Sequence, residues 1–280
     1  MTSSPQAWLI TGVSSGLGRA IAEAALAAGH VVVGTLRKAD QFAAFEALAP
    51  GRAHAIALDV TDAEAVGPAV DAAARLAGGL DVVVNNAGYG LVGAVEELSE
   101  AEAARQMDTN FFGVFRVVKA AIPHLKARGG GAIINIGSVA GARGFPSMGL
   151  YCASKFAVTG LSQALAKELA PFGIRVTVVE PGGFRTNFGA SSMAWAQAPL
   201  PDYAATTARM RQSMERPAVP APNDPARGAA VILALAGMDK PPVHMTLGAD
   251  GRKYVMDALQ TRLADYDLHV DLVESTAYPD

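Results

Sequence analysis

Residues 11–18 read TGVSSGLG and follow directly on a short apolar run, residues 7–10. An apolar strand, a glycine-rich turn and a helix in this order form the arrangement that binds the pyrophosphate of a dinucleotide. Gly12 permits the tight turn, Gly16 lets backbone approach a phosphate, and Gly18 lets the following helix pack closely on the sheet. Because the start of that helix offers unpaired N–H groups to an anion, the stretch predicts a dinucleotide site.

The residues after this turn continue the same pattern. Residues 17–28 have the apolar spacing of an amphipathic helix that Gly29 closes, and residues 31–33 are a second apolar run. Strand and helix then alternate, with strands expected near 7–12, 31–36, 53–58, 81–85, 132–137, 174–180 and 243–247. Such alternation predicts a parallel sheet with helices on both faces. We therefore expect an α/β fold: a doubly wound, seven-stranded parallel sheet, Rossmann-like, in one domain over residues 1–280.

Composition and charge limit the possible partners. The 280 residues carry a net charge of -3, with 23 basic and 26 acidic residues spread along the chain, which predicts no nucleic acid and no membrane as partners. No apolar stretch is long enough to span a bilayer, and residues 1–6 lack the pattern of a signal peptide. The single Cys152 permits no internal disulfide, and the five histidines lack metal-ligand spacing. We therefore expect a cytoplasmic protein without a metal site.

Tyr151 and Lys155 form a second informative pattern, because they lie one helical turn apart on the same expected helix face. A lysine charge about 4 Å from the phenol would favour phenolate by about 4 kcal/mol in a partly shielded site. Burial would oppose this effect, so a second positive charge such as an oxidised nicotinamide ring would help. The pair thus predicts a group that gives and takes a proton. Cys152 should turn away from this face and is not expected to be a nucleophile.

Five short motifs follow one another in a fixed order between residue 7 and about residue 250. They are the glycine-rich turn, Asn85-Asn86-Ala87-Gly88, Asn110, Ser138 with the Tyr151/Lys155 pair, and Pro181-Gly182 followed by Thr186. Together they resemble the short-chain dehydrogenase/reductase family, in its compact single-domain branch. The resemblance implies an NAD(P)(H)-dependent oxidoreductase that interconverts a secondary alcohol and a ketone, with a small-molecule carbonyl or alcohol as substrate.

The resemblance also implies catalytic roles. Tyr151 would be the general acid in reduction and the general base in oxidation, and Ser138 would hold the substrate oxygen as charge develops. Lys155 would lower the pKa of the phenol and bind the nicotinamide ribose. Asn110 would keep a water connected to Lys155, which would give the proton a route to solvent.

The cofactor-binding residues that the resemblance implies come from six parts of the chain. Asp59 is similar to the family aspartate that accepts a hydrogen bond from the adenine amino group, and Thr186 would bind the nicotinamide carboxamide. Many relatives carry a smaller aliphatic residue where Phe184 stands. The full set is Gly12, Ser14, Ser15, Gly16, Leu17, Gly18, Arg37, Lys38, Asp59, Val60, Asn86, Ala87, Gly88, Tyr151, Lys155, Pro181, Gly182, Phe184 and Thr186.

The choice between NADP and NAD depends on the end of the second strand. A carboxylate about twenty residues after the glycine turn would bind the ribose hydroxyls of NAD, whereas an arginine would pair with the 2′-phosphate of NADP. Thr35 stands at the expected acid position, and Arg37 and Lys38 follow it. We therefore expect NADP as the cofactor, with NAD the less favoured one. The alternative is that the two cations are ordinary exposed charges before the next helix.

Residues 187–222 are rich in Ala, Ser, Met and Pro and are expected to form a mobile lid over the substrate. Their composition gives little intrinsic helix preference. Apolar side chains in and beside this segment would suit a ketone with a hydrophobic body, although such side chains are also typical of a core. They are Phe184, Phe188, Met193, Trp195 and Met210.

Other functions are compatible with the same motifs. A reductase of 3-oxoacyl thioesters would use basic residues such as Arg143 and Arg185 to meet an acidic carrier. A non-catalytic redox sensor would bind the dinucleotide without turnover, but such relatives commonly lack the tyrosine or the lysine. A dimerising or scaffold protein could use the long fourth and fifth helices as an apolar interface. Because members of the family are often dimers or tetramers through these helices, the resemblance implies a homodimer or homotetramer. The charged C-terminal extension, residues 252–280, need not join that contact.

Overall fold

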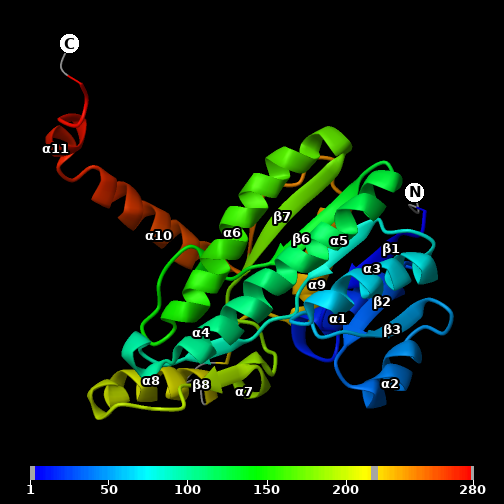
Figure 1. Cartoon of the computed structure of the whole chain (residues 1–280), viewed down its shortest axis with the longest axis horizontal. Coiled ribbons are helices and arrows are strands. Elements are labelled where there is room, and N and C mark those ends of the chain that lie inside the picture. The colour runs from blue at the N-terminus through cyan, green and yellow to red at the C-terminus, as the bar shows by residue number, and fades with distance from the viewer. Residues whose placement is uncertain (1–3, 216–219, 279–280) are drawn as a thin grey trace.

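The computed structural model describes residues 4–215 and 220–278. Its centre is a seven-stranded sheet in which every neighbouring pair of strands is parallel (Figure 1). The strand order is β3-β2-β1-β4-β6-β7-β9. The strands are β1 Ala7–Ile10, β2 Val31–Leu36, β3 Ala53–Ala57, β4 Val82–Asn85, β6 Gly131–Ile136, β7 Ile174–Pro181 and β9 His244–Leu247. The predicted doubly wound, seven-stranded α/β fold in one domain is confirmed.

Helices cover both faces of this sheet, as expected for a parallel sheet. Successive residues of a strand point to opposite faces, so Leu9 of β1 packs in one core while Trp8 and Ile10 pack in the other. The first core lies under α3 Ala63–Ala77, α5 Gly113–Ala127 and α6 Gly149–Leu169. The second lies under α1 Gly16–Ala27, α2 Phe42–Glu46 and α9 Pro225–Gly237.

The order of the strands places a ligand site. The chain passes from β1 outward to β2 and β3, then returns to the other side of β1 with β4. Ligands of open α/β sheets bind at such a reversal, at the carboxyl ends of the strands. The glycine-rich turn, Asn86 and Ser138 follow β1, β4 and β6, respectively, and all lie at this edge.

The expected lid contains more regular structure than its composition predicts. It includes α7 Phe188–Ser191, β8 Met193–Trp195 and α8 Ala204–Glu215, and β8 pairs in parallel with β5 Gly90–Val92. In Figure 1 this yellow segment lies below α4 Glu100–Met107. Residues 216–219 of the predicted lid lie outside the described residues. The composition of the whole segment was therefore a poor guide to α8, because the residues of α8 itself, AATTARMRQSME, are mostly good helix formers.

The C-terminal extension consists of α10 Ala249–Tyr266 and α11 Val270–Glu274. Figure 1 shows these helices, in orange and red, running away from the sheet. Near the start of α10, Gly251 and Val255 are buried, whereas every residue from Leu259 to Tyr278 is exposed. In the part of the chain that the structure describes, no helix combines the length and apolar character needed to cross a membrane.

Candidate active site

The glycine-rich turn has the conformation that a dinucleotide site needs. Gly12 and Gly16 have φ angles of +73° and +62°, in the left-handed region that favours glycine. Ser15, which precedes α1, makes no side-chain capping hydrogen bond, so the first N–H groups of α1 keep their capacity to bind an anion. Ser14 and Ser15 are exposed on the turn. The backbone of this turn therefore fits a bound phosphate.

Hydrogen bonds between Thr11 and Gly12 of the turn and Asn86 and Ala87 tie the turn to the segment after the neighbouring strand, β4. The amide nitrogen of Asn86 donates to the carbonyls of Thr11 and Gly12, both at 3.0 Å. The Thr11 hydroxyl accepts from the backbone N–H groups of Asn86 and Ala87 at 2.9 and 3.0 Å. A Cβ on Gly18 would lie 2.3 Å from the Asn86 amide nitrogen. Asn86 thus shapes the turn, and Gly18 makes room for it.

Arg37 follows β2 and Asp59 lies just after β3, so the charge of Arg37 acts on the Asp59 carboxylate. The Asp59 carboxylate is exposed and accepts hydrogen bonds from the backbone and hydroxyl of Thr61, at 3.0 and 2.8 Å. Partial burial acts to raise the pKa of Asp59, but these hydrogen bonds and the charge of Arg37 outweigh it and lower the pKa. Arg37 and Lys38 are exposed, whereas Val60 packs in the core.

Tyr151, Lys155 and Ser138 come together where β6 ends. Tyr151 and Lys155 lie in α6 and are each 7% exposed, and the Lys155 Nζ lies 5.9 Å from the centre of the Tyr151 ring. Lys155 also donates to the carbonyl of Ile136, the last residue of β6, at 2.8 Å. The side chains of Ser138 and Tyr151 share a hydrogen bond. Three of the four predicted catalytic side chains therefore form one cluster.

Burial dominates the titration of this cluster. Burial raises the pKa of Tyr151 to about 12, although the hydrogen bond with Ser138 acts in the opposite direction. Burial also lowers the pKa of Lys155 to about 8. Desolvation disfavours the charged form of each group, phenolate and ammonium alike. The protein groups by themselves thus do not produce the lowered phenol pKa that the Tyr151/Lys155 spacing predicts.

Asn110, the fourth predicted catalytic residue, lies in a π-helical turn, Asp108–Phe112, between α4 and α5. Such turns in helices occur frequently at functional sites. The Asn110 side chain accepts from Tyr89 N–H at 3.0 Å and donates to the Tyr89 carbonyl at 2.9 Å and the Ser154 hydroxyl at 3.1 Å. The Ser154 hydroxyl donates to the Tyr151 carbonyl at 2.7 Å. Asn110 is thereby tied to the catalytic helix, and its water link to Lys155 stays a prediction.

Gly88 lies next to the side chains of Asn110 and Lys155. A Cβ at this position would lie 3.0 Å from the Asn110 side-chain oxygen and 3.8 Å from the Lys155 Nζ. The segment after β4 therefore runs directly past Asn110 and Lys155. This links the predicted cofactor-binding residues Asn86 to Gly88 with the predicted catalytic cluster.

The loop after β7 is held by two residues that sequence reasoning missed. The Asp250 carboxylate accepts from Gly183 N–H at 2.7 Å and from the Asn223 amide at 2.7 Å. Asn223 also donates to the Gly183 carbonyl at 2.8 Å. A Cβ on Gly182 would lie 2.4 Å from the Asp250 carboxylate. Because Asn223 and Asp250 are distant in sequence from Pro181 and Gly182, no local spacing could have indicated them.

Thr186 and Phe184 take different positions beyond this loop. Thr186 faces the glycine-rich turn, since a Cβ on Gly16 would lie 3.6 Å from the Thr186 Cβ. Phe184 packs near Leu17 and Gly228, in the core between α1, α9 and the sheet. It does not join the other aromatic and methionine side chains that were expected to line one apolar cavity with it.

Those other side chains gather around Tyr151. The Phe188 ring centre lies 6.2 Å from that of Tyr151, and the other buried residues of the cluster are Val92, Ala140, Met148 and Cys152. Burial raises the pKa of the Cys152 thiol, which disfavours the nucleophilic thiolate. The partly buried members of the cluster are Phe145, Phe156, Phe188, Met193, Trp195 and Met210. The surroundings of the phenol are therefore largely apolar.

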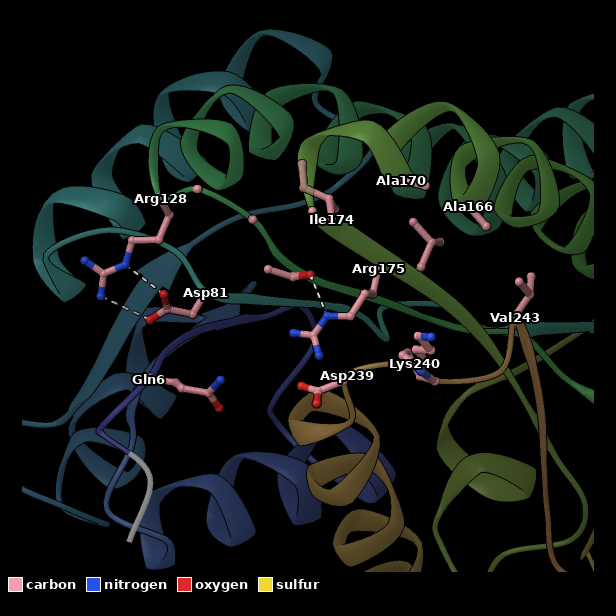
Figure 2. Close-up of a pocket in the computed structure, with 16 residues that line it drawn as sticks. Gln6, Asp81, Arg128, Ala166, Ala170, Ile174, Arg175, Asp239, Lys240 and Val243 are labelled. Carbon is pink, nitrogen blue, oxygen red and sulfur yellow. Dashed lines mark hydrogen bonds and ion pairs between the residues drawn. The ribbon is translucent and has the colours of Figure 1, made fainter. Parts of the chain in front are cut away.

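A cavity of about 630 Å³ lies at the opposite, amino-terminal end of the strands (Figure 2). Its arginines are already engaged: Arg128 pairs with Asp81 at 2.7 Å, and Arg175 donates to the carbonyls of Gly131 and Met238. It is remote from Ser138 and Tyr151, which lie at the carboxyl end of the sheet. We assign it no part in the chemistry.

Comparison with known proteins agrees with this geometry. The family model described as short chain dehydrogenase matches residues 6–197. The chain belongs to the short-chain dehydrogenase/reductase family. It is 38% identical over 254 residues to oxidoreductase BOA17 of Botryotinia fuckeliana, a match that covers 90% of this chain and 92% of that protein.

Two further members of the short-chain dehydrogenase/reductase family extend the comparison. The crystal structure of a short-chain dehydrogenase from Streptomyces avermitilis superposes with a TM-score of 0.92 at 39% identity, over 99% of this chain and 100% of that one. Human 17-beta-hydroxysteroid dehydrogenase type 1 is 40% identical over 190 residues, which cover 64% of this chain and 57% of that protein. Members of this family are oxidoreductases that bind NAD(P) cofactors and act on small molecules.

Proposed function

We propose that this protein interconverts a secondary alcohol and a ketone, with NADP as the hydride carrier. The observation that carries the proposal is the cluster of Ser138, Tyr151 and Lys155 at the carboxyl end of β6. It lies at the edge of the sheet where the strand order reverses and beside Gly88. A proton donor thus adjoins the place where a dinucleotide would bind.

The residues that would hold the dinucleotide fit it. The positive φ angles of Gly12 and Gly16 and the uncapped start of α1 suit the pyrophosphate. Arg37 favours the 2′-phosphate of NADP over the unphosphorylated ribose of NAD. The position where an NAD-binding protein would carry an acidic residue holds Thr35. When bound, NADP(H) supplies or accepts the hydride.

The chain's own side chains handle the proton. With a pKa of about 12, the Tyr151 phenol keeps its proton at neutral pH and can donate it to a carbonyl oxygen that the Ser138 hydroxyl holds. In the reverse direction the phenol must release its proton, and a charged Lys155 beside it favours that step. Asn110 acts as a positioning residue, because both of its amide hydrogens are engaged with Tyr89 and Ser154.

We further propose a substrate with a hydrophobic body. Support comes from the apolar side chains around Tyr151, including Phe188 and Met193, and from a relative named for a hydroxysteroid. The 3-oxoacyl thioester reductase is less favoured, because Arg143 lies against Phe145 and Arg185 donates to the Ala221 carbonyl. The sensor without turnover is less favoured because the chain keeps both Tyr151 and Lys155.

A screen of apolar and polar ketones and alcohols tests the proposal, with NADPH and NADH consumption or formation followed by absorbance. We expect turnover of apolar ketones and a dissociation constant at least about tenfold lower for NADPH than for NADH, a difference of about 1.4 kcal/mol. The variant Arg37→Ala should lose this preference, whereas Arg75→Ala, at an exposed site in α3, should keep it. Preference for NADH would contradict the cofactor proposal, and tight binding without any turnover would favour the sensor.

A further inference from the structure

The segment after β7, residues 182–188, reaches both ends of the site. Thr186 faces the glycine-rich turn, where a Cβ on Gly16 would lie 3.6 Å from the Thr186 Cβ. Two residues further on, the ring centre of Phe188 lies 6.2 Å from that of Tyr151. A dinucleotide with its pyrophosphate at the turn and its reacting carbon at Tyr151 would therefore run along this segment. The half of the cofactor that it would border is the half that carries the nicotinamide.

Two side chains from other parts of the chain hold the beginning of this segment. The Asp250 carboxylate, in the first turn of α10, accepts from Gly183 N–H and from the Asn223 amide, both at 2.7 Å. The Asn223 amide also donates to the Gly183 carbonyl at 2.8 Å. Both backbone groups of Gly183 are thus bound by side chains that lie 40 and 67 residues further along the chain. We call Asn223 and Asp250 the anchoring pair.

The backbone of Asn223 adds a second set of contacts to the same segment. Its N–H donates to the Gly183 carbonyl at 3.1 Å, and its carbonyl accepts from Arg185 N–H at 3.0 Å. The Arg185 Nε donates to the Ala221 carbonyl at 2.7 Å. The start and the end of the lid are therefore joined at the anchoring pair.

The surroundings of the anchoring pair leave room for it and keep it charged. A Cβ on Gly182 would lie 2.4 Å from the Asp250 carboxylate, and one on Gly248 would lie 2.4 Å from the Asn223 amide nitrogen. Partial burial acts to raise the pKa of Asp250, but hydrogen bonds from Asn223 and from nearby backbone N–H groups outweigh it and lower the pKa. At neutral pH both oxygens of this carboxylate therefore serve as acceptors.

We propose that Asn223 and Asp250 are positioning residues that hold residues 182–188 against the nicotinamide half of bound NADPH, an inference that rests on the proposed function. Fixing the backbone of a segment costs conformational entropy, and a segment that is fixed before binding spares the ligand this cost. Loss of the anchoring pair should therefore weaken contacts to the nicotinamide half. Contacts to the adenosine half, which the residues after β2 and β3 would make, should stay unchanged.

Calorimetric binding of NADPH and of adenosine 2′,5′-bisphosphate, its adenosine half, to the full chain tests the proposal. Asp250→Asn keeps the size of the side chain, but one oxygen that accepted a hydrogen bond becomes an NH₂ group that faces a donor. We expect the dissociation constant for NADPH to rise at least about tenfold and that for the bisphosphate to stay within about twofold of the wild type. Asn223→Ala is the second variant and should show the same difference between the two ligands.

Asp257→Asn is the matched control. This carboxylate lies in the same helix, is 46% exposed and pairs with Lys253, so the variant should bind both ligands like the wild type. Circular dichroism should show that all three variants keep their helix content. Equal weakening of both ligands in the two anchoring-pair variants would indicate a general structural role and overturn the proposal. Unchanged NADPH binding in both variants would also overturn it.

Because this test measures binding alone, its failure differs from a failure of the proposed function. A wild type that binds NADPH without turning over any ketone would favour the sensor, and the two affinities would still test the anchoring pair. A wild type that prefers NADH would contradict the cofactor proposal, and NADH with ADP-ribose would then replace the two ligands. A wild type that binds neither dinucleotide would overturn both proposals.

Discussion

Tyr151 and Lys155 show how burial acts on two side chains that ionise with opposite sign. The pKa of the phenol rises to about 12 and that of the ammonium falls to about 8, because desolvation disfavours both charged forms. Below pH 8 the folded protein therefore keeps a buried charge at Lys155. This charge costs stability, as expected at a site whose proposed chemistry uses a cation beside the phenol.

Lys155→Met should make the protein more stable at pH 7 while removing activity. A pKa lowered from 10.5 to about 8 corresponds to a cost of about 3 kcal/mol, and loss of the hydrogen bond to Ile136 offsets part of the gain. We expect a net increase of about 1–2 kcal/mol in the free energy of unfolding, measured by urea denaturation.

The pH dependence of that difference gives a further check. Between pH 8 and 10.5 the unfolded chain holds a proton on Lys155 that the folded protein has released, so wild-type stability rises with pH in this window. The advantage of Lys155→Met should thus be largest below pH 8 and mostly gone at pH 10. Lys167→Met, at an exposed site in the same helix, should show no such trend. A Lys155→Met protein less stable than the wild type at pH 7 would contradict this explanation.

Local sequence patterns predicted one class of site residue well and missed another. The order of the motifs led to Ser138, Tyr151 and Lys155, which the structure brings together. Asn223 and Asp250, which hold the loop after β7, carry no such pattern, because an Asn–Asp contact across 27 residues depends on how the whole chain folds.

The turn between β1 and α1 depends on close contact with the segment after β4. Gly18→Ala should disrupt it, because the new Cβ would lie 2.3 Å from the Asn86 amide nitrogen and 2.5 Å from the Gly12 carbonyl oxygen. We expect a loss of about 1–3 kcal/mol of stability and at least tenfold weaker NADPH binding by calorimetry.

Gly160→Ala is the matched control within another helix, α6. A Cβ at Gly160 would meet nothing within 4 Å, so the substitution should stabilise the protein by about 0.5–1 kcal/mol through helix preference alone. Equal effects of the two substitutions would show that contact with Asn86 does not determine the need for glycine at position 18.

Two buried carboxylates attach the lid to the segment after β5. Glu97 accepts from Leu200 N–H at 2.9 Å and from Ala94 N–H at 2.7 Å, and Glu102 accepts from Gln197 N–H at 3.1 Å. The hydrogen bonds from Leu200 and Ala94 hold the pKa of Glu97 below its usual value. The contribution of Glu97 to stability is therefore present above its unfolded pKa and is lost as pH falls through the folded value.

Glu97→Ala should loosen the lid without unfolding the sheet. Leu200 loses its acceptor, so its amide should exchange with solvent about tenfold faster or more, and KM should rise because the lid no longer holds the substrate side in place. Hydrogen exchange followed by mass spectrometry gives the first quantity and steady-state kinetics the second. Glu100→Ala, at an exposed position nearby, should change neither. Unchanged exchange at Leu200 would refute this role.

The same elements explain which parts of the fold the sequence could predict. β1 and most of β2, β4 and β6 are apolar runs between helices, and the predicted ranges of all seven strands agree with the structure to within two residues. β5 and β8 have three residues each, too few to show a period of two, and they pair across about a hundred residues. Short strands of this kind form because tertiary contacts favour them.

Across the whole molecule, the cofactor site and the candidate catalytic site are built by different parts of the chain. These parts meet at one edge of the sheet. The glycine-rich turn lies in the first βα unit, whereas Tyr151 lies in α6 after β6. Both follow strands of one parallel sheet, so the reversal of strand order places both at the carboxyl ends of the strands.

Because the glycine-rich turn and Tyr151 lie in different parts of the chain, cofactor binding and turnover can be measured independently in one variant, Tyr151→Phe. The substitution removes only the phenolic hydroxyl and keeps the buried ring in its apolar surroundings. We expect turnover of a ketone to fall by about 10³-fold or more, about 4 kcal/mol in the barrier, while the dissociation constant of NADPH stays within about twofold of the wild type. Near-normal turnover in Tyr151→Phe would contradict the assignment of this phenol as the proton donor.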